Sequence, residues 1–71
     1  RHQPRFATAA NTLGVVYARA GDARTAEVAY RRALEADPGS IGALGNLVHL
    51  LRGVGRVAEA DLLKARLDRL E

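Results

Sequence analysis

A period of 34 residues constrains this 71-residue chain more than any other feature. Shifting the sequence by that period superimposes apolar, glycine and proline positions. The identical pairs are Pro4/Pro38, Ala9/Ala43, Leu13/Leu47, Gly21/Gly55, Ala26/Ala60 and Arg32/Arg66. Composition alone would give roughly four such pairs in a chain so rich in Ala, Leu and Arg. All but the arginine pair, however, fall on a turn glycine, a terminating proline or a helix-packing site, so we predict two copies of one structural unit.

Residues that favour helix starts and ends, together with the spacing of apolar residues, predict four helices. Pro4 suits the first turn of the first helix, and Gly21 suits its end. The side-chain oxygens of Asp22 and Ser40 can cap the second and third helices. The fourth helix is expected over residues 57–70. Because the loops between these segments are short, consecutive helices must pack antiparallel, which predicts an all-α fold of two stacked helix-turn-helix hairpins.

Apolar residues at steps of three and four predict one buried face for each helix. The four faces comprise Phe6, Ala10, Leu13, Tyr17 and Ala20; Ala23, Ala26, Tyr30, Ala33 and Leu34; Ile41, Leu44, Leu47, Val48 and Leu51; and Ala60, Leu63, Leu67 and Leu70. Small residues at Gly14 and Ala26 would let the first two helices approach closely. We expect one continuous core, with Tyr30 between the two hairpins, built from Leu13, Tyr17, Ala26, Tyr30, Leu34, Leu44, Leu47 and Leu51.

The first copy carries a recognisable pattern: Leu13-Gly14-x-x-Tyr17, then Gly21, Ala26, Tyr30, Ala33 and Pro38. This pattern and its period resemble the tetratricopeptide repeat. The resemblance implies a first repeat over residues 7–40 and a second, incomplete or terminal repeat over 41–71. Residues 1–6 would be the tail of a preceding repeat or an N-terminal extension. Because such solenoids need at least about three repeats and the chain starts at Arg1, we expect a piece of a longer array.

The sequence offers little for catalysis or metal binding. It contains no cysteine, and His2 and His49 alone cannot build a structural zinc site. Gly53-x-Gly55 lacks the strand that precedes a phosphate-binding loop. Glu59 and Asp61 are two apart on a helix and point to different sides, so they form no working carboxylate pair. We predict no catalytic residue, no metal and no cofactor, and no apolar run of about 18 residues that could span a membrane.

The net charge of +3 is uneven. Six Arg and three acidic residues give +3 over residues 1–36, whereas five charges of each sign cancel over residues 37–71. A basic first hairpin could attract acidic peptides or nucleic acid. The favoured interpretation is that the excess is the solvated surface of an Arg-rich chain.

The family resemblance also implies a binding surface, because inner helices of such repeats line a concave groove for a partner's peptide. The candidate groove residues are Thr8, Asn11, Thr12, Val15, Arg19, Gly42, Gly45, Asn46, His49 and Arg52. Asn46 is singled out because an amide both donates and accepts, and so can hold a peptide backbone of any sequence. The alternative is a solvated polar residue. Thr12 is its counterpart in the first copy, so an asparagine ladder would be incomplete.

A carboxylate clamp of the kind found in one subfamily is not predicted. Asn11, Val15 and Gly42 stand where that subfamily would place cations or their partners. Arg19 and Arg52 could still reach a carboxylate bidentately. Gly42 and Gly45 either let a ligand approach the backbone or are tolerated by packing.

The leading hypothesis is a protein–protein interaction module whose protein or peptide partner the sequence does not identify. The alternatives are an RNA-binding helical-hairpin repeat, which lacks exposed aromatics for stacking, and a structural or dimerisation segment. Lys64 and Asp68 replace Tyr30 and Leu34 in the second copy, so we expect them to pair and to face water. We also expect a two-fold homodimer through leucines of the fourth helix (Leu62, Leu63, Leu67, Leu70) or through the N-terminal open face at Phe6 and Ala10.

Overall fold

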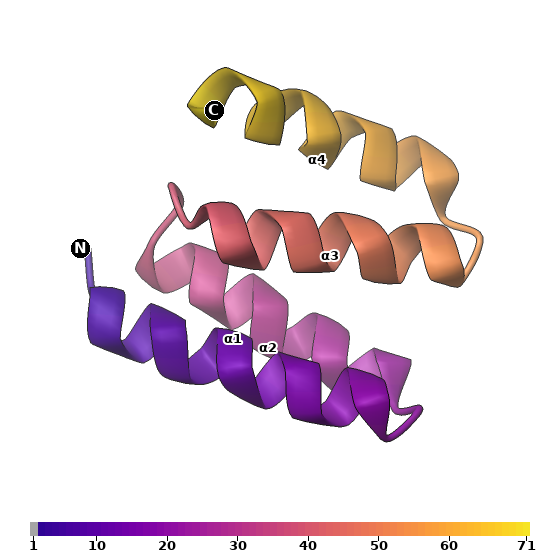
Figure 1. Ribbon diagram of the computed structural model, residues 1–71, viewed down its shortest axis with the longest axis horizontal. Helices are drawn as coiled ribbons and strands as arrows, with labels where there is room; N and C mark the ends of the chain where they lie inside the picture. Colours follow the sequence, from indigo (N-terminus) through magenta and orange to yellow (C-terminus); the bar gives the residue numbers. More distant parts are fainter. Residues whose placement is uncertain (1) are drawn as a thin grey trace.

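The computed structural model describes residues 2–71 and contains four helices (Figure 1). They are α1 (Pro4–Arg19), α2 (Ala23–Ala36), α3 (Ile41–Gly53) and α4 (Val57–Leu70). Helices α1 and α2 form one antiparallel hairpin, and α3 and α4 form the second. The second hairpin stacks on the first through α3, which packs mainly against α2. The predicted all-α fold of two stacked hairpins is confirmed.

The helix ends follow from the residues predicted to set them. Asp22 accepts a hydrogen bond from the Thr25 amide at 3.1 Å, and Ser40 caps α3 in the same way at 3.2 Å. Gly21 and Gly55 close the two hairpin turns with φ angles of +84° and +86°. A side chain would strain the backbone there, which explains why both repeats keep glycine at this position.

Tyr30 and Gly14 make the closest packing contact in the first hairpin. A Cβ atom added to Gly14 would lie 2.4 Å from Tyr30 Cε1, well inside the van der Waals distance. The tyrosine ring therefore lies directly against the α1 backbone. This confirms that a small residue at Gly14 allows α1 and α2 to approach closely.

The buried residues form two clusters rather than the single core that we expected. One joins Ala26 and Tyr30 of α2 to Leu47, Val48 and Leu51 of α3 and Ala60 of α4. The other joins Ala10, Ala33 and Ala43, and half-buried Leu34 packs against both. Tyr30 lies between the hairpins, as predicted.

Several predicted core residues are exposed instead. Leu13 is 50% exposed, and the others are Phe6, Ala20, Ile41 and Leu70. The buried face of α1 is Ala7, Ala10 and Gly14, rotated from the predicted stripe. The physical reason is that α1 packs on α2 and α3, while nothing in residues 2–71 covers its other side. The spacing of apolar residues marks both the buried side and the uncovered side of α1, but it does not show which of the two is covered by a neighbouring helix.

The uncovered side carries Phe6, Leu13 and Val16 of α1 and Val28 of α2, each about half exposed, and we call these residues the open face. Ala10, which the sequence analysis placed there with Phe6, is 8% exposed and belongs to the second buried cluster. The open face therefore extends along α1 from Phe6 through Leu13, not through Ala10.

Helix α4 is polar on part of its surface. Lys64 pairs with Asp68 on the solvent side, as predicted. Of the leucines on α4, Leu67 is buried and Leu63 is half-buried, whereas Leu62 is 73% exposed. No helix within residues 2–71 has the length and hydropathy needed to cross a bilayer.

Candidate functional site

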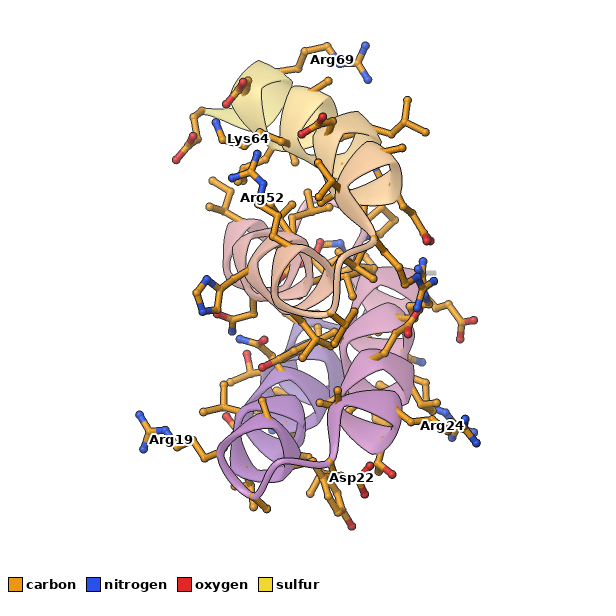
Figure 2. All side chains as sticks on the ribbon, turned by 90° about the vertical axis from the view of Figure 1, so that its right-hand side faces the viewer. Arg19, Asp22, Arg24, Arg52, Lys64 and Arg69 are labelled. Atoms are coloured by element: carbon orange, nitrogen blue, oxygen red, sulfur yellow. The ribbon has the colours of Figure 1, made fainter. Side chains whose placement is uncertain are left out.

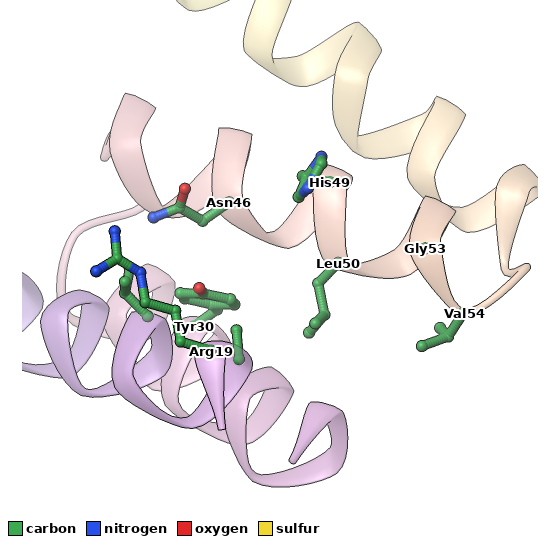
Figure 3. Close-up of a pocket in the computed structure, with 9 residues that line it drawn as sticks. Arg19, Tyr30, Asn46, His49, Leu50, Gly53 and Val54 are labelled. Atoms are coloured by element: carbon green, nitrogen blue, oxygen red, sulfur yellow. The ribbon is translucent and has the colours of Figure 1, made fainter. Parts of the chain in front are cut away.

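A cavity of about 430 Å³ lies between α1 and α3, where the two hairpins meet (Figure 3). Both hairpins contribute side chains to it. Its walls are Val15, Ala18 and Arg19 of α1, Tyr30 of α2, and Asn46, His49, Leu50, Gly53 and Val54 at and after α3. The cavity is therefore a product of stacking, because neither hairpin alone supplies both walls.

A hydrogen bond between two amides crosses the groove beside this cavity. Asn46 Nδ2 of α3 donates to Asn11 Oδ1 of α1 at 2.9 Å. Asn46 is half-buried and lines the cavity. The partner of Asn46 is Asn11 rather than Thr12, its counterpart in the repeat, because helix stacking brings Asn11 opposite Asn46 and leaves Thr12 exposed.

With the fold and the cavity established, the family can be assigned. A model of the tetratricopeptide repeat matches residues 7–50, which include most of α1, all of α2 and most of α3. This chain belongs to the tetratricopeptide repeat family. Such repeats form a non-catalytic scaffold fold and generally mediate protein–protein interactions. No curated protein and no solved structure matches the chain significantly.

The floor of the cavity in this tetratricopeptide repeat protein is Tyr30. Its side chain is only 3% exposed, and burial raises the pKa of its hydroxyl group. Within residues 2–71 the hydroxyl makes no hydrogen bond, yet no side-chain polar atom is both fully buried and unpaired. The hydroxyl must therefore reach the surface through the cavity that Tyr30 lines.

The basic side chains near the groove differ in their pairing. No ion pair joins Arg19 or His49 to a carboxylate within residues 2–71, and both line the cavity. Arg52, by contrast, lies 3.4 Å from Asp61 of α4 and does not line the cavity. In Figure 2, Arg19 projects from the opposite side of the first hairpin to Arg24. Of the predicted groove residues, Arg19 and His49 thus line the cavity without an ion pair to a carboxylate within residues 2–71.

The remaining predicted groove residues lie outside the cavity. The Thr8 hydroxyl donates to the Pro4 carbonyl at 2.9 Å, one turn earlier on α1. An added Cβ at Gly42 would lie 3.3 Å from Asn11 Nδ2, whereas one at Gly45 would meet nothing within 4 Å. Four of the predicted groove residues therefore line the cavity: Val15, Arg19, Asn46 and His49. Asn11 does not line it but accepts the hydrogen bond from Asn46.

Sequence reasoning missed five residues that line the cavity: Ala18, Tyr30, Leu50, Gly53 and Val54. Tyr30 was assigned to the core, which is correct for its ring but not for its hydroxyl. Leu50 and Val54 are exposed or half-buried apolar residues near the end of α3. Leu50 lies four residues after Asn46, and Val54 lies four residues after Leu50, so continuing the groove stripe from Asn46 in steps of one helical turn could have found both.

An ion-pair cluster joins the two hairpins on another surface, formed by Glu27 and Arg31 of α2, Arg56, and Glu59 of α4. Arg56 Nη1 lies 2.6 Å from Glu27 Oε1. Hydrogen bonds from Arg56, together with Arg31, lower the pKa of both Glu27 and Glu59. Because the ion pairs Arg31–Glu59 and Arg56–Glu27 connect α2 to the second hairpin, the cluster links the two hairpins.

Proposed function

We propose that this chain is a protein–protein interaction module that binds an extended peptide segment of a partner in the groove between α1 and α3. The observation that carries the proposal is the cavity lined by residues of both hairpins beside the Asn11–Asn46 hydrogen bond. Because the groove forms where the hairpins stack, side chains of both α1 and α3 face the same ligand. An extended peptide can contact both rows of side chains along its length. The family's general role in protein–protein interaction supports this assignment.

Asn46 is the residue proposed to hold the peptide backbone. One of its two amide hydrogens is used in the bond to Asn11 Oδ1, whereas the second hydrogen and the carbonyl oxygen have no partner within residues 2–71. A donor and an acceptor on one side chain match the N–H and C=O of a peptide group. The bond to Asn11 restrains the side chain, which lowers the entropy lost when a peptide binds.

An array of random peptides, blocked at both ends, tests the proposal. Wild-type protein and Asn46→Ala are compared, with Arg24→Ala as the matched control because Arg24 is exposed on the other side of the hairpin. We expect peptides whose affinity falls about fivefold with Asn46→Ala, as for the loss of one hydrogen-bonding group, and is unchanged with Arg24→Ala. Binding that ignores Asn46, or the absence of any bound peptide, would contradict the groove assignment.

The structure favours a peptide over single-stranded RNA. Stacking recognition of RNA needs aromatic faces on the binding surface. The Tyr30 ring is packed against Gly14, and exposed Phe6 lies on the open face rather than in the groove. A catalytic function is not proposed either, because the family is a scaffold fold.

The open face supports a second proposal, a two-fold homodimer. Leu47, the counterpart of Leu13 one repeat later, is fully buried against α2, while Leu13 is half exposed. The same repeat position therefore has an apolar neighbour in one hairpin and none in the other. The open face is favoured over α4 because exposed apolar residues of α1 and α2 adjoin there, whereas α4 exposes leucines beside the Lys64–Asp68 pair.

Sedimentation of the wild type and of two matched variants tests the dimer. Leu13→Ser should shift the protein towards monomer, whereas Leu62→Ser, on exposed α4, should leave its mass unchanged. A wild-type monomer at all accessible concentrations would contradict self-association. Loss of the dimer only with Leu62→Ser would place the interface on α4 instead.

A further inference from the structure

Helix α1 carries a regular apolar row on the side that no other helix of residues 2–71 covers. We call this row the seam, and its five residues, all exposed, are Phe6, Ala9, Leu13, Val16 and Ala20. The steps of three, four, three and four residues form the a/d pattern by which two helices pair in a coiled coil. In Figure 1, α1 lies at one end of the stack of helices, so a further helix can approach this side.

The first turn of α1 shows that the seam is more than a surface for stacking repeats. Helix α1 begins at Pro4, whereas α3 begins at Ile41, three residues after Pro38, the counterpart of Pro4. This additional turn contains Phe6, whose counterpart is Ser40, the polar N-cap of α3. Because α2 packs on α3 without an apolar residue at that position, stacking of one repeat on the next does not require Phe6.

The seam has two unlike edges. Arg5 and Arg19 each directly precede a seam residue, so both follow one edge. Ala10 and Tyr17 each directly follow a seam residue and pack into the clusters that contain residues of α2. Helix α2 therefore follows the opposite edge. One edge of the seam is basic, and the other is formed by α2.

The α2 edge carries an acidic residue near each end. The Gln3 amide donates to the Ala36 carbonyl at 2.8 Å, which places Glu35 level with the first turn of α1. The Asp22 amide donates to the Tyr17 carbonyl at 2.9 Å, which places Asp22 beside the last turn. Neither carboxylate forms an ion pair within residues 2–71.

The two edges therefore differ in net charge. Exposed Arg24 and Arg32 balance Asp22 and Glu35 on the α2 side, whereas α1 contains no acidic residue to balance its arginines. In Figure 2, Arg19 projects to the left of α1, and Asp22 lies at the lower right, beside α2. A partner whose own neutral, partly acidic edge meets the basic edge of α1 is favoured over one that is basic there.

We propose that this partner is a second copy of the chain, whose α1 pairs with α1 in the same direction about a two-fold axis parallel to the helices. The proposal rests on the homodimer proposed above and specifies its interface. Parallel pairing places the basic edge of each α1 against the α2 edge of the other copy, so Arg5 meets Glu35 of the partner subunit and Arg19 meets Asp22 of the partner subunit. Antiparallel pairing would place the two basic edges together, which like charges disfavour.

The seam is self-complementary in this arrangement. About a two-fold axis, each seam residue meets its own counterpart. Phe6 and Leu13, each about half exposed, become covered by the same residues of the second copy. Between them, small Ala9 allows the two backbones to approach. A cavity of about 340 Å³ beside Phe6 and Val28 leaves room for a second aromatic ring.

Disulfide exchange tests the pairing, because the chain contains no cysteine of its own. Ala9→Cys places a thiol in the seam, and Ala65→Cys, on exposed α4, is the matched control. Mass spectrometry measures the fraction of disulfide-linked dimer in a glutathione redox buffer. We expect about tenfold more dimer from Ala9→Cys at equal concentration, because pairing raises the effective thiol concentration. Adding Leu13→Ser to Ala9→Cys should remove the difference.

A charge exchange tests the direction of pairing. Arg5→Glu in the Ala9→Cys protein should lower the dimer fraction about threefold, because two carboxylates then meet at each end of the seam. Adding Glu35→Arg should restore it. Antiparallel pairing predicts the reverse for Arg5→Glu, since that change would relieve repulsion between Arg5 and Arg19. Melting curves of the reduced variants should match the wild type, because these side chains are exposed.

Each failure has a distinct meaning. A wild-type monomer in sedimentation would overturn the homodimer and this proposal together, and would leave the seam to a helix of another protein. A dimer that requires Leu13 but is not linked by Ala9→Cys would overturn the parallel seam alone. A dimer that Arg5→Glu strengthens would do the same.

Discussion

The two hairpins share one backbone plan but pack their helices with different side chains. In the first hairpin, Tyr30 lies on Gly14, where even a methyl group would clash. At the same repeat positions the second hairpin has Val48, which is buried, and Lys64, which pairs with Asp68. The contact between the Tyr30 ring and the Gly14 backbone in the first repeat thus has no equivalent in the second repeat. A buried Val48 and the Lys64–Asp68 ion pair occupy those positions instead.

The same comparison shows that burial depends on the neighbouring repeat. Leu13 and Leu47 occupy equivalent positions, yet Leu13 is half exposed and Leu47 is fully buried. The difference lies in α2, which covers α3 and has no counterpart before α1 within residues 2–71. The core of this molecule is therefore largely the interface between its hairpins.

The largest expected effect comes from truncating the ring that joins the hairpins. Tyr30→Ala should destabilise the protein by about 3–5 kcal/mol because it opens a cavity in the larger buried cluster. Lys64→Ala, at the equivalent position of α4, should cost less than about 1 kcal/mol. Urea unfolding followed by circular dichroism measures both. Similar losses would show that the two hairpins are packed alike after all.

The leucine pair sharpens the comparison of the two hairpins. Leu47→Ala should cost about 2–5 kcal/mol as a fully buried leucine. At low protein concentration, Leu13→Ala should lower the free energy of unfolding by less than about 1 kcal/mol, because Leu13 is already 50% exposed to water. Thermal melts at low and high protein concentration provide the measurement. A concentration-dependent penalty for Leu13→Ala would indicate that the open face is covered in a dimer.

A third comparison uses two glycines within helices. Gly14→Ala should destabilise by about 1–3 kcal/mol through the clash with Tyr30. Gly45→Ala meets nothing within 4 Å and should stabilise α3 by up to about 1 kcal/mol through helix propensity. In a Tyr30→Ala background the penalty at Gly14 should largely disappear. If both glycine variants were equally tolerated, the close contact between α1 and α2 would be wrong.

The smallest effect concerns the ion-pair cluster between the hairpins. Arg56 and Arg31 lower the pKa of Glu27 and Glu59 in the folded state. Their stabilisation is therefore fully present above 4.5, the ordinary pKa of Glu, and is lost as the pH falls through the lowered values. Melting temperature against pH should show this decline, and Glu27→Gln should flatten it.

Salt and Asp22 provide the controls for that titration. High salt should reduce the difference between Glu27→Gln and the wild type, since the cluster is partly exposed. Some acid sensitivity should remain in the variant, because hydrogen bonds from Thr25 also lower the pKa of Asp22. An acid response identical in wild type and variant would show that the cluster does not link the hairpins energetically.

Most of the fold could be predicted because it follows from local rules. The caps at Asp22 and Ser40 and the turn glycines act over a few residues, and all four were confirmed. The exposure of Leu13 could not be predicted, because a helical stripe does not reveal which neighbour covers it. For the same reason Ile41 and Leu70, at helix ends, were wrongly assigned to the core.

The candidate site was less accessible to sequence reasoning. The repeat period identifies Thr12 as the counterpart of Asn46 but does not predict which residues meet across the groove. The hydrogen bond between Asn46 and Asn11 forms only because α3 stacks on α1 and α2. Tyr30 has two roles that a sequence pattern cannot separate: its ring is core, while its hydroxyl opens into the cavity. The chemistry of the groove therefore becomes visible only when both hairpins are in place.

Amide chemical-shift mapping with an array-selected peptide tests the central claim, that stacking of two hairpins creates the binding groove. The account predicts that the largest shifts fall on residues 11–19 of α1 and 46–54 of α3, with the outward side of α2 around Arg24 unchanged. Shifts confined to the open face around Leu13 and Val28, or to the exposed side of α4, would contradict it.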